Sequence, residues 1–332
     1  MRVLLAGATG VIGRPLVPLL RAAGHDVVGL TRRPDRLPAL AAVGAQGRVV
    51  DALDPAAVDA VVADVRPDAV IDQLTALPER YDPRRLDDFY GATNRLRRDG
   101  TAALLAAAEA HGARRYLLQS ISFLTAPEGP DVLDEDARPW TDAPAAPAAE
   151  MVRILVGNEA RVTGSARLAG LALRYGFLYG PGTYLASDGS MADEVRSRRM
   201  PLVGGGGGRW SLVHAFDAAR ATVAALERGA PGVYNVVDDD PAPMREWLPA
   251  FAAALGAKPP RRVPAWLARL LVGELPVRQA TAARGASNAR ARAELDWAPA
   301  IPSWRTGLVE HRDGDPVGPA PRPAGAASPE AG

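Results

Sequence analysis

Three glycines near the N-terminus are spaced to bind a phosphate-bearing ligand. Residues 7–13 read G-x-x-G-x-x-G, after an apolar run and before a helical pattern. In this setting the first glycine allows a tight turn and the second lets the backbone approach a pyrophosphate at the helix N-terminus. The third lets helix and strand pack closely. The residues expected to bind a dinucleotide here are Gly7, Thr9, Gly10, Val11, Ile12 and Gly13.

The end of the next predicted strand carries residues that discriminate between two dinucleotides. Sites for NAD(H) usually place an acidic residue there to bind the ribose 2′-hydroxyl. This chain has Thr31 instead, followed by Arg32 and Arg33. Guanidinium groups suit a 2′-phosphate, so we expect the cofactor to be NADP(H), with NAD(H) disfavoured. The alternative is that both arginines simply face solvent in a loop.

Composition limits the chemistry open to this chain. There is no cysteine among the 332 residues, which excludes a thiol nucleophile, an iron–sulfur cluster and Cys-ligated zinc. Lys258 is the single lysine, and the other 38 of the 39 basic residues are arginine. A net charge of +1 gives no reason to expect nucleic acid or an anionic membrane as a partner. No His/Asp/Glu spacing indicates a metal site.

The elements that position these residues alternate between strands and helices. We expect strands at residues 3–6, 26–30, 47–50, 69–73, 116–119 and 171–175, and helices at 11–23, 37–43, 55–65, 92–111 and 150–162. Such alternation predicts a parallel sheet with helices on both faces, which is a Rossmann-type doubly wound α/β fold.

The remainder predicts a smaller second lobe and a tail. We assign residues 1–180 and about 210–237 to the Rossmann domain, and 181–209 with 238–310 to a C-terminal substrate lobe. Residues 311–332 are rich in Pro, Ala and Gly and are expected to be disordered. Five consecutive glycines at 204–208 favour a mobile loop, with a phosphate cradle as the alternative.

Taken together, these features resemble the extended short-chain dehydrogenase/reductase superfamily, of the NAD-dependent epimerase/dehydratase type, over about residues 1–310. Residues 51–54, 68–76, 94–101, 179–182, 210–217 and 234–236 are similar to segments of that superfamily. The resemblance implies further cofactor contacts: adenine near Asp51 and Ala52, phosphates and ribose near Leu74 and Thr75, and the central helix at Asn94.

The resemblance also identifies candidates for catalysis. The superfamily uses a Ser or Thr together with a Tyr-x-x-x-Lys pair one helical turn apart, and the pair moves a proton at the reacting oxygen. Residues 119–122, Gln-Ser-Ile-Ser, are similar to the serine segment. Ser120, and also Ser122, are therefore expected to hold the substrate oxygen.

The expected Tyr-x-x-x-Lys pair is absent from this chain. Residues 150–162 contain neither tyrosine nor lysine, and alignment through Glu159 puts Met151 and Leu155 at the two positions. Neither side chain can move a proton. Another group has to replace the pair, and the candidates are Tyr175, Tyr179 or water.

Residues 175 and 177 differ from the superfamily at the loop after the sixth strand. Tyr175 and Phe177 stand where a proline and an asparagine are usual, close to the expected nicotinamide site. Packing is the preferred interpretation for Phe177, because aromatic residues at strand ends usually fill a core. For Tyr175, packing and a catalytic phenol stay equally open.

Three functions follow from these observations. The first is an atypical NADP(H)-binding oxidoreductase or epimerase-like enzyme that acts on a small metabolite bearing a hydroxyl or carbonyl. The second is a non-redox isomerase, dehydratase or cyclase, and the third is a nucleotide-responsive regulator. No secretory leader or membrane span is recognised, so we expect a cytoplasmic location. By analogy with the superfamily, the helix at 92–111 is a candidate surface for a homodimer.

Overall fold

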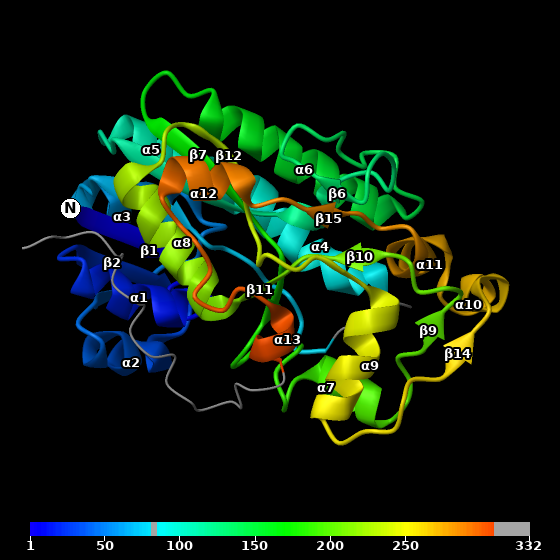
Figure 1. The fold of residues 1–332 in the computed structure, drawn as a ribbon. Coiled ribbons are helices and arrows are strands. Elements are labelled where there is room, and N and C mark those ends of the chain that lie inside the picture. The colour runs from blue at the N-terminus through cyan, green and yellow to red at the C-terminus, as the bar shows by residue number, and fades with distance from the viewer. Residues whose placement is uncertain (81–84, 309–332) are drawn as a thin grey trace, which may run out of the picture.

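A parallel sheet of seven strands forms the larger part of the structure, a computed structural model that describes residues 1–80 and 85–308 (Figure 1). Its strands follow the order β12-β7-β5-β4-β1-β2-β3, and every neighbouring pair is parallel. The strands are β1 (Arg2–Ala6), β2 (Asp26–Thr31), β3 (Gln46–Val49), β4 (Ala69–Asp72), β5 (Arg115–Ile121), β7 (Ala169–Tyr175) and β12 (Gly232–Val236). This arrangement confirms the predicted Rossmann-type fold. The predicted tail at 311–332 lies outside the described residues.

Helices cover both faces of the sheet because successive strand side chains point to opposite sides. Leu5 of β1 belongs to one buried cluster with Leu16 and Ala218, whereas its neighbour Leu4 belongs to another with Val62 and Leu104. The first face is covered by α1 (Gly13–Ala22), α2 (Leu37–Ala42), α8 (Ala215–Arg228) and α12 (Ala289–Leu295). The second is covered by α3 (Pro55–Val65), α5 (Thr101–Ala110) and α6 (Ala146–Thr163) (Figure 1).

The long helix predicted at 92–111 begins earlier and contains a wider turn. It consists of α4 (Leu86–Arg95), a π-helical turn η2 (Leu96–Gly100) and α5. Asp87 and Asp88 in the first turn of α4 favour a helix start there, and the prediction missed this signal. The π turn buries Arg97, whose pKa is lowered to about 10 by that burial. Wide turns of this kind often occur beside functional sites.

The second lobe is built from short elements around a tryptophan-rich core. Its elements are β8 (Phe177–Tyr179), α7 (Ser190–Arg196), β9 (Leu202–Val203), β10 (Arg209–Trp210), β11 (Leu212–His214), β13 (Ala242–Pro243), α9 (Met244–Ala254), β14 (Arg262–Val263), α10 (Ala265–Val272), α11 (Glu274–Thr281) and α13 (Trp304–Gly307). Trp247, Phe251 and Trp304 are almost fully buried at its centre. Helix α12, although late in the chain, packs against α8 and β12 of the Rossmann sheet.

The run of five glycines at 204–208 is a hydrogen-bonded connection, and the prediction of a mobile loop is not supported. The Gly208 N–H donates to the Ala280 carbonyl at 3.0 Å, and the Gly208 carbonyl accepts from the Met244 N–H at 2.9 Å. The Gly206 N–H is likewise bound to the Val203 carbonyl. Three of the five N–H groups, those of Gly204, Gly206 and Gly208, are thus occupied, and the run leads into strand β10 rather than a helix N-terminus, which argues against a phosphate cradle. The run holds the start of α9 beside the end of α11.

Within the described part of the chain, no helix is both long and apolar enough to span a membrane. The described His, Asp and Glu residues also form no cluster that could hold a metal ion.

Candidate active site

The predicted glycine motif forms the turn between β1 and α1, at the point where the sheet order reverses between β1 and β4. Gly7 has a φ of +81°, and a Cβ on it would come within 2.5 Å of the Gln73 carbonyl oxygen. A Cβ on Gly13 would lie 2.2 Å from the Gly7 oxygen. Gly10 is exposed, and its N–H donates to the Gly7 carbonyl at 3.0 Å. The turn therefore fits a dinucleotide pyrophosphate, which needs a bare backbone at a helix N-terminus.

An arginine follows the turn directly. Arg14 is exposed, and its guanidinium lies against Gly182 in the loop after β8, where a Cβ would come within 2.0 Å of Nη2. The Arg14 N–H donates to the Gly10 carbonyl at 3.0 Å, but its side chain makes no hydrogen bond or ion pair with the residues that the structure describes. A free guanidinium beside the N-terminus of α1 adds positive charge where a pyrophosphate would bind.

The two arginines after β2 have different surroundings. The Thr31 hydroxyl accepts a hydrogen bond from the Arg33 N–H at 3.1 Å. The Arg33 guanidinium is engaged by Asp35, with Nε–Oδ1 at 3.1 Å and Nη2–Oδ2 at 2.7 Å. Arg32 is exposed and has no polar partner within residues 1–80 and 85–308. Only Arg32 is thus free to bind a ligand without breaking an existing ion pair.

The remaining predicted cofactor residues lie along the same edge of the sheet. Asp51 Oδ1 accepts the Leu53 N–H at 3.0 Å, and buried Ala52 neighbours Leu74 across Gly100. Thr75 is half-buried in the segment after β4. Asn94 is buried and donates to the Pro147 carbonyl at 3.2 Å, which ties α4 to α6; its Oδ1 has no partner among the described residues.

Ser120 is held inside a buried polar network. Its hydroxyl donates to Glu159 Oε1 at 2.5 Å. Glu159 also receives two hydrogen bonds from Arg174, at 2.9 and 2.7 Å. All three side chains are buried, so Ser120 faces α6 and its hydroxyl is already engaged.

The two candidate phenols are also buried. The Tyr175 hydroxyl accepts a hydrogen bond from Gln73 and contacts the Thr222 hydroxyl, both at 2.8 Å. Burial raises the pKa of Tyr175 to about 12, and it raises the pKa of Tyr179 as well. Because both residues are at most 1% exposed, their position argues against proton transfer to a substrate. Their catalytic role stays a prediction.

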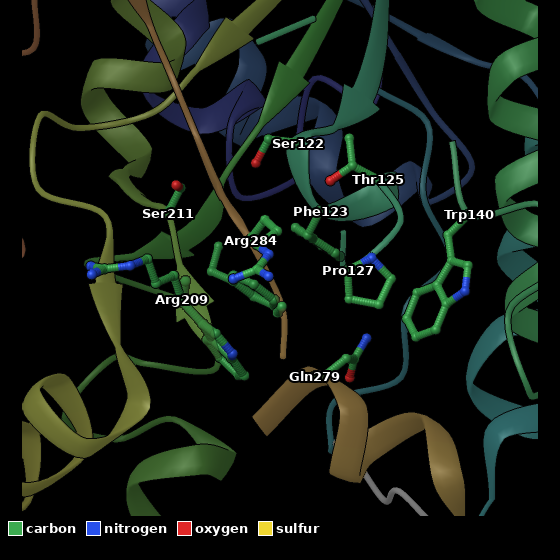
Figure 2. A pocket seen from close by; sticks show the side chains of 12 residues that line it. Ser122, Phe123, Thr125, Pro127, Trp140, Arg209, Ser211, Gln279 and Arg284 are labelled. Atoms are coloured by element: carbon green, nitrogen blue, oxygen red, sulfur yellow. The ribbon is translucent and has the colours of Figure 1, made fainter. Parts of the chain in front are cut away.

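A pocket between the sheet edge and the second lobe is lined by Ser122 and by aromatic side chains (Figure 2). The rings of Phe123 and Phe177 stack with centroids 4.1 Å apart, and Phe177 stacks on Trp210 at 3.9 Å. Phe177 thus combines the predicted packing role with a place in the pocket wall. Ser122, unlike Ser120, belongs to the lining of this pocket. The further lining residues are Thr125, Pro127, Trp140, Arg209, Ser211, Gln279, Ala283 and Arg284.

The sequence offered no signal for most of this lining. Trp140, Arg209, Gln279 and Arg284 are far apart along the chain and belong to no motif. Arginine is too frequent here, at 38 residues, for two of them to attract notice. Backbone pairing brings the two arginines together: β6 (Val132–Leu133) pairs with β15 (Gly285–Ala286), which follows Arg284, and the Arg209 N–H donates to the Ala283 carbonyl at 2.8 Å.

Comparison with known proteins identifies a family whose model matches most of this chain. The profile of the NAD dependent epimerase/dehydratase family matches residues 3–236. The chain belongs to this family. The resemblance read from the sequence is confirmed, and the family assignment makes the chain an enzyme with a Rossmann fold of the short-chain dehydrogenase/reductase type.

Relatives of this epimerase/dehydratase-family enzyme are named as reductases. It is 52% identical over 309 residues to a 3-diazoavenalumate denitrifying reductase of a Streptomyces species, a match that covers 93% of this chain and 99% of the relative. It is 30% identical to a 2-alkyl-3-oxoalkanoate reductase of Stenotrophomonas maltophilia, over 77% of this chain and 76% of the relative. These relatives support an enzyme with redox activity.

A solved structure shares the fold of this epimerase/dehydratase-family enzyme. The UDP-glucose 4-epimerase of Thermotoga maritima, solved with UDP-glucose, superposes with a TM-score of 0.72 at 18% identity. The match covers 93% of this chain and 96% of the epimerase.

Helix α6 of this epimerase/dehydratase-family enzyme lacks both tyrosine and lysine along its 18 residues. Met151 and Leu155, which the predicted alignment through Glu159 puts at the positions of the superfamily pair, are 6% and 0% exposed. They belong to an apolar cluster with Ile121 at the end of β5 and with Leu124. The structure therefore supplies hydrocarbon side chains where the alignment leads us to expect a proton donor.

Proposed function

We propose that this enzyme is an NADPH-dependent reductase that removes a diazo group from a small conjugated carboxylate. The 52% identity with a diazoavenalumate denitrifying reductase, spanning nearly the whole of both chains, supports this choice of reaction. Phe123, Phe177 and Trp210 form a stack of aromatic rings, the aromatic wall, in the pocket lining, and its exposed edges would contact the conjugated part of such a substrate.

The observation that carries the proposal is the apolar cluster of Ile121, Met151 and Leu155. Reduction of a carbonyl needs a hydride at carbon and a proton at oxygen, so it benefits from a positioned acid. Reduction of a diazonium group needs only the hydride: R–N₂⁺ and H⁻ give R–H and N₂, which balances in atoms and charge. A nicotinamide cofactor supplies that hydride when it is bound. A site without an available phenol is adequate for this reaction.

The residues of the chain would then have separate tasks. The turn at Gly7–Gly13 and Arg14 would hold the cofactor pyrophosphate, and Arg32 would bind the 2′-phosphate that distinguishes NADPH. Ser122 would orient the substrate in the pocket. The hydrocarbon side chains of Met151 and Leu155 would exclude water, which otherwise attacks diazonium groups.

Three further assignments accompany this proposal, and they concern the domains, the oligomeric state and the location of the protein. The division into a Rossmann domain of 1–180 with about 210–237 and a substrate lobe of 181–209 with 238–310 stays a prediction. Tyr179, Trp210 and Leu212, of β8, β10 and β11, pack in the core of the second lobe, and α12, at 289–295, packs with the Rossmann domain. A homodimer through the helical surface at 92–111, and a cytoplasmic location, also stay predictions.

The proposal is tested with diazotised 3-aminocinnamate and NADPH. We expect one N₂ released, one NADPH consumed and one cinnamate formed for each turnover. A 3-oxoalkanoate serves as the comparison substrate, because a second relative is named as a reductase of that class. Turnover of the oxoalkanoate without N₂ release from the diazo compound would replace the proposed reaction with carbonyl reduction.

A further inference from the structure

Two arginines beside the pocket share one carboxylate. Arg209 contacts Asp131 Oδ2 at 3.0 Å through both Nε and Nη2, and Arg284 Nη1 contacts Asp131 Oδ1 at 3.2 Å. The Asp131 side chain is 62% exposed and the Arg284 side chain only 27%. Two guanidinium groups facing one carboxylate leave a net positive charge at this end of the pocket.

The backbone fixes this arrangement. Asp131 and Arg284 directly precede β6 and β15, which pair in parallel, and the Gly285 N–H donates to the Asp131 carbonyl at 2.9 Å. Arg209 lies beside them through the bond between its N–H and the Ala283 carbonyl. The two arginines are thus held in position before any ligand arrives, which reduces the entropy lost on binding.

Arg284 has a donor with no partner. Its Nε is buried and makes no hydrogen bond to any residue that the structure describes. A buried N–H group that is left unpaired costs free energy, and proteins rarely retain one without a ligand or water to satisfy it. Arg209, in contrast, is also bound to the Pro241 carbonyl through Nη1 at 3.2 Å. Arg284 has fewer of its donors occupied than Arg209, since among the described residues only its Nη1 is hydrogen-bonded, to Asp131.

Polar donors and aromatic side chains surround Arg284 in the lining of the pocket. Figure 2 shows Arg284 among the residues that line the pocket, with Ser122 and Gln279 as polar neighbours in the lining and Trp140 across from it. The aromatic wall lowers the local dielectric constant, which strengthens a charge-assisted hydrogen bond from a guanidinium group.

We propose that Arg284 binds the carboxylate of a planar conjugated acid, with Gln279 as a second donor and with the body of the acid lying along the aromatic wall. This inference rests on the proposed function in that the same pocket would hold the reducible substrate. Arg284 then determines which end of the substrate enters, and Asp131 and Arg209 keep Arg284 in position.

The test measures binding alone, without cofactor or turnover. Trp140 and Trp210 line the pocket, so quenching of tryptophan fluorescence reports a bound acid. The probes are 4-hydroxycinnamate and its methyl ester, which share the aromatic body and differ at the carboxyl group, where the ester has no charge and one added methyl group. We expect the wild-type protein to bind the acid at least about tenfold more tightly than the ester.

Arg284→Gln is expected to weaken binding of the acid by about tenfold or more and to leave binding of the ester unchanged. Arg278→Gln is the matched control: Arg278 is an exposed arginine of α11 that pairs with Glu274, and it is absent from the pocket lining. Thermal unfolding of both variants verifies that they fold.

Equal affinity of the wild-type protein for acid and ester, or unchanged affinity of Arg284→Gln for the acid, would overturn the inference. These outcomes are separable from the fate of the proposed reaction. Arg284-dependent binding of the acid with no N₂ release would retain the carboxylate site and reject the diazo chemistry. Reduction of the diazo compound with the same KM for its free acid and its ester would retain the diazo chemistry and reject the carboxylate site.

Discussion

The Ser120 hydroxyl donates a 2.5 Å hydrogen bond to the Glu159 carboxylate, which is also bound through two hydrogen bonds by Arg174. This contact links the end of β5 to α6 and to β7 inside the protein. It gives a structural task to a serine that the sequence places among the catalytic candidates, and it leaves Ser122 as the serine that meets the pocket.

Substitution of the two serines is expected to have opposite effects. Ser120→Ala should lower the free energy of unfolding by about 1–2 kcal/mol, because it removes a buried hydrogen bond to a charged group, and should change kcat/KM little. Ser122→Ala should leave stability nearly unchanged and raise KM by about three- to tenfold. Urea unfolding and steady-state kinetics of both variants check this. Loss of turnover in a stable Ser120→Ala protein would restore Ser120 to the catalytic site.

Gly13→Ala is expected to disable cofactor binding. The added Cβ would lie 2.2 Å from the Gly7 oxygen, so α1 would have to move away from the turn, at a cost of about 1–3 kcal/mol. NADPH titration by fluorescence measures the loss directly. Gly91→Ala is the matched control, because Gly91 lies in α4 and a Cβ there meets no atom within 4 Å. Equal NADPH affinity in the two variants would contradict the assigned cofactor site.

Arg32→Ala is expected to weaken NADPH binding by about tenfold while NADH binding stays the same, because only NADPH carries the 2′-phosphate. Arg33→Ala should have a smaller effect on NADPH, since its guanidinium is already engaged by Asp35. Calorimetric titration of each variant with both nucleotides distinguishes these cases. Tighter binding of NADH than of NADPH by the unmodified protein would reject the proposed preference outright.

Leu155→Lys places an unpaired amine in the apolar cluster of α6. At pH 7 we expect the free energy of unfolding to fall by about 3 kcal/mol or more, because a buried charge without a partner is strongly destabilising. Burial lowers the pKa of such a lysine, so the penalty grows as pH falls and shrinks as pH approaches the normal lysine pKa near 10. Denaturant unfolding at pH 7 and pH 9.5, with Leu155→Met as the volume-matched control, measures both effects. An unchanged free energy of unfolding for Leu155→Lys at pH 7 would show that position 155 is polar and accessible to water.

The rate of diazo reduction is expected to vary little with pH between about 5.5 and 7.5. Tyr175, with a pKa raised to about 12, stays protonated throughout this range and no side chain is needed as an acid. Single-turnover rates at saturating NADPH provide the measurement. A rate that falls steadily with rising pH, following a single ionisation of the enzyme, would reveal a general acid in the site.

Local sequence determined the Rossmann half of this protein. The spacing of Gly7, Gly10 and Gly13 and the alternation of strands and helices are short-range patterns, and the parallel sheet follows from them. The absence of tyrosine and lysine from α6 is equally a property of the sequence. Each of these features can be recognised without knowing which residues far apart in the chain are in contact.

The pocket was decided by tertiary structure alone. Ser120 and Ser122 are two residues apart and look equivalent in the sequence. Packing of α6 against β5 nevertheless brings Glu159 to the Ser120 hydroxyl, whereas Ser122, just after β5, lines the pocket. Arg209 and Arg284 meet through strand pairings between segments that are separated by up to 153 residues. Five glycines that favour mobility by composition are ordered because their amides and carbonyls bond to α9 and α11. The physical reason is the same in each case: a hydrogen-bonding partner far along the chain outweighs local preference.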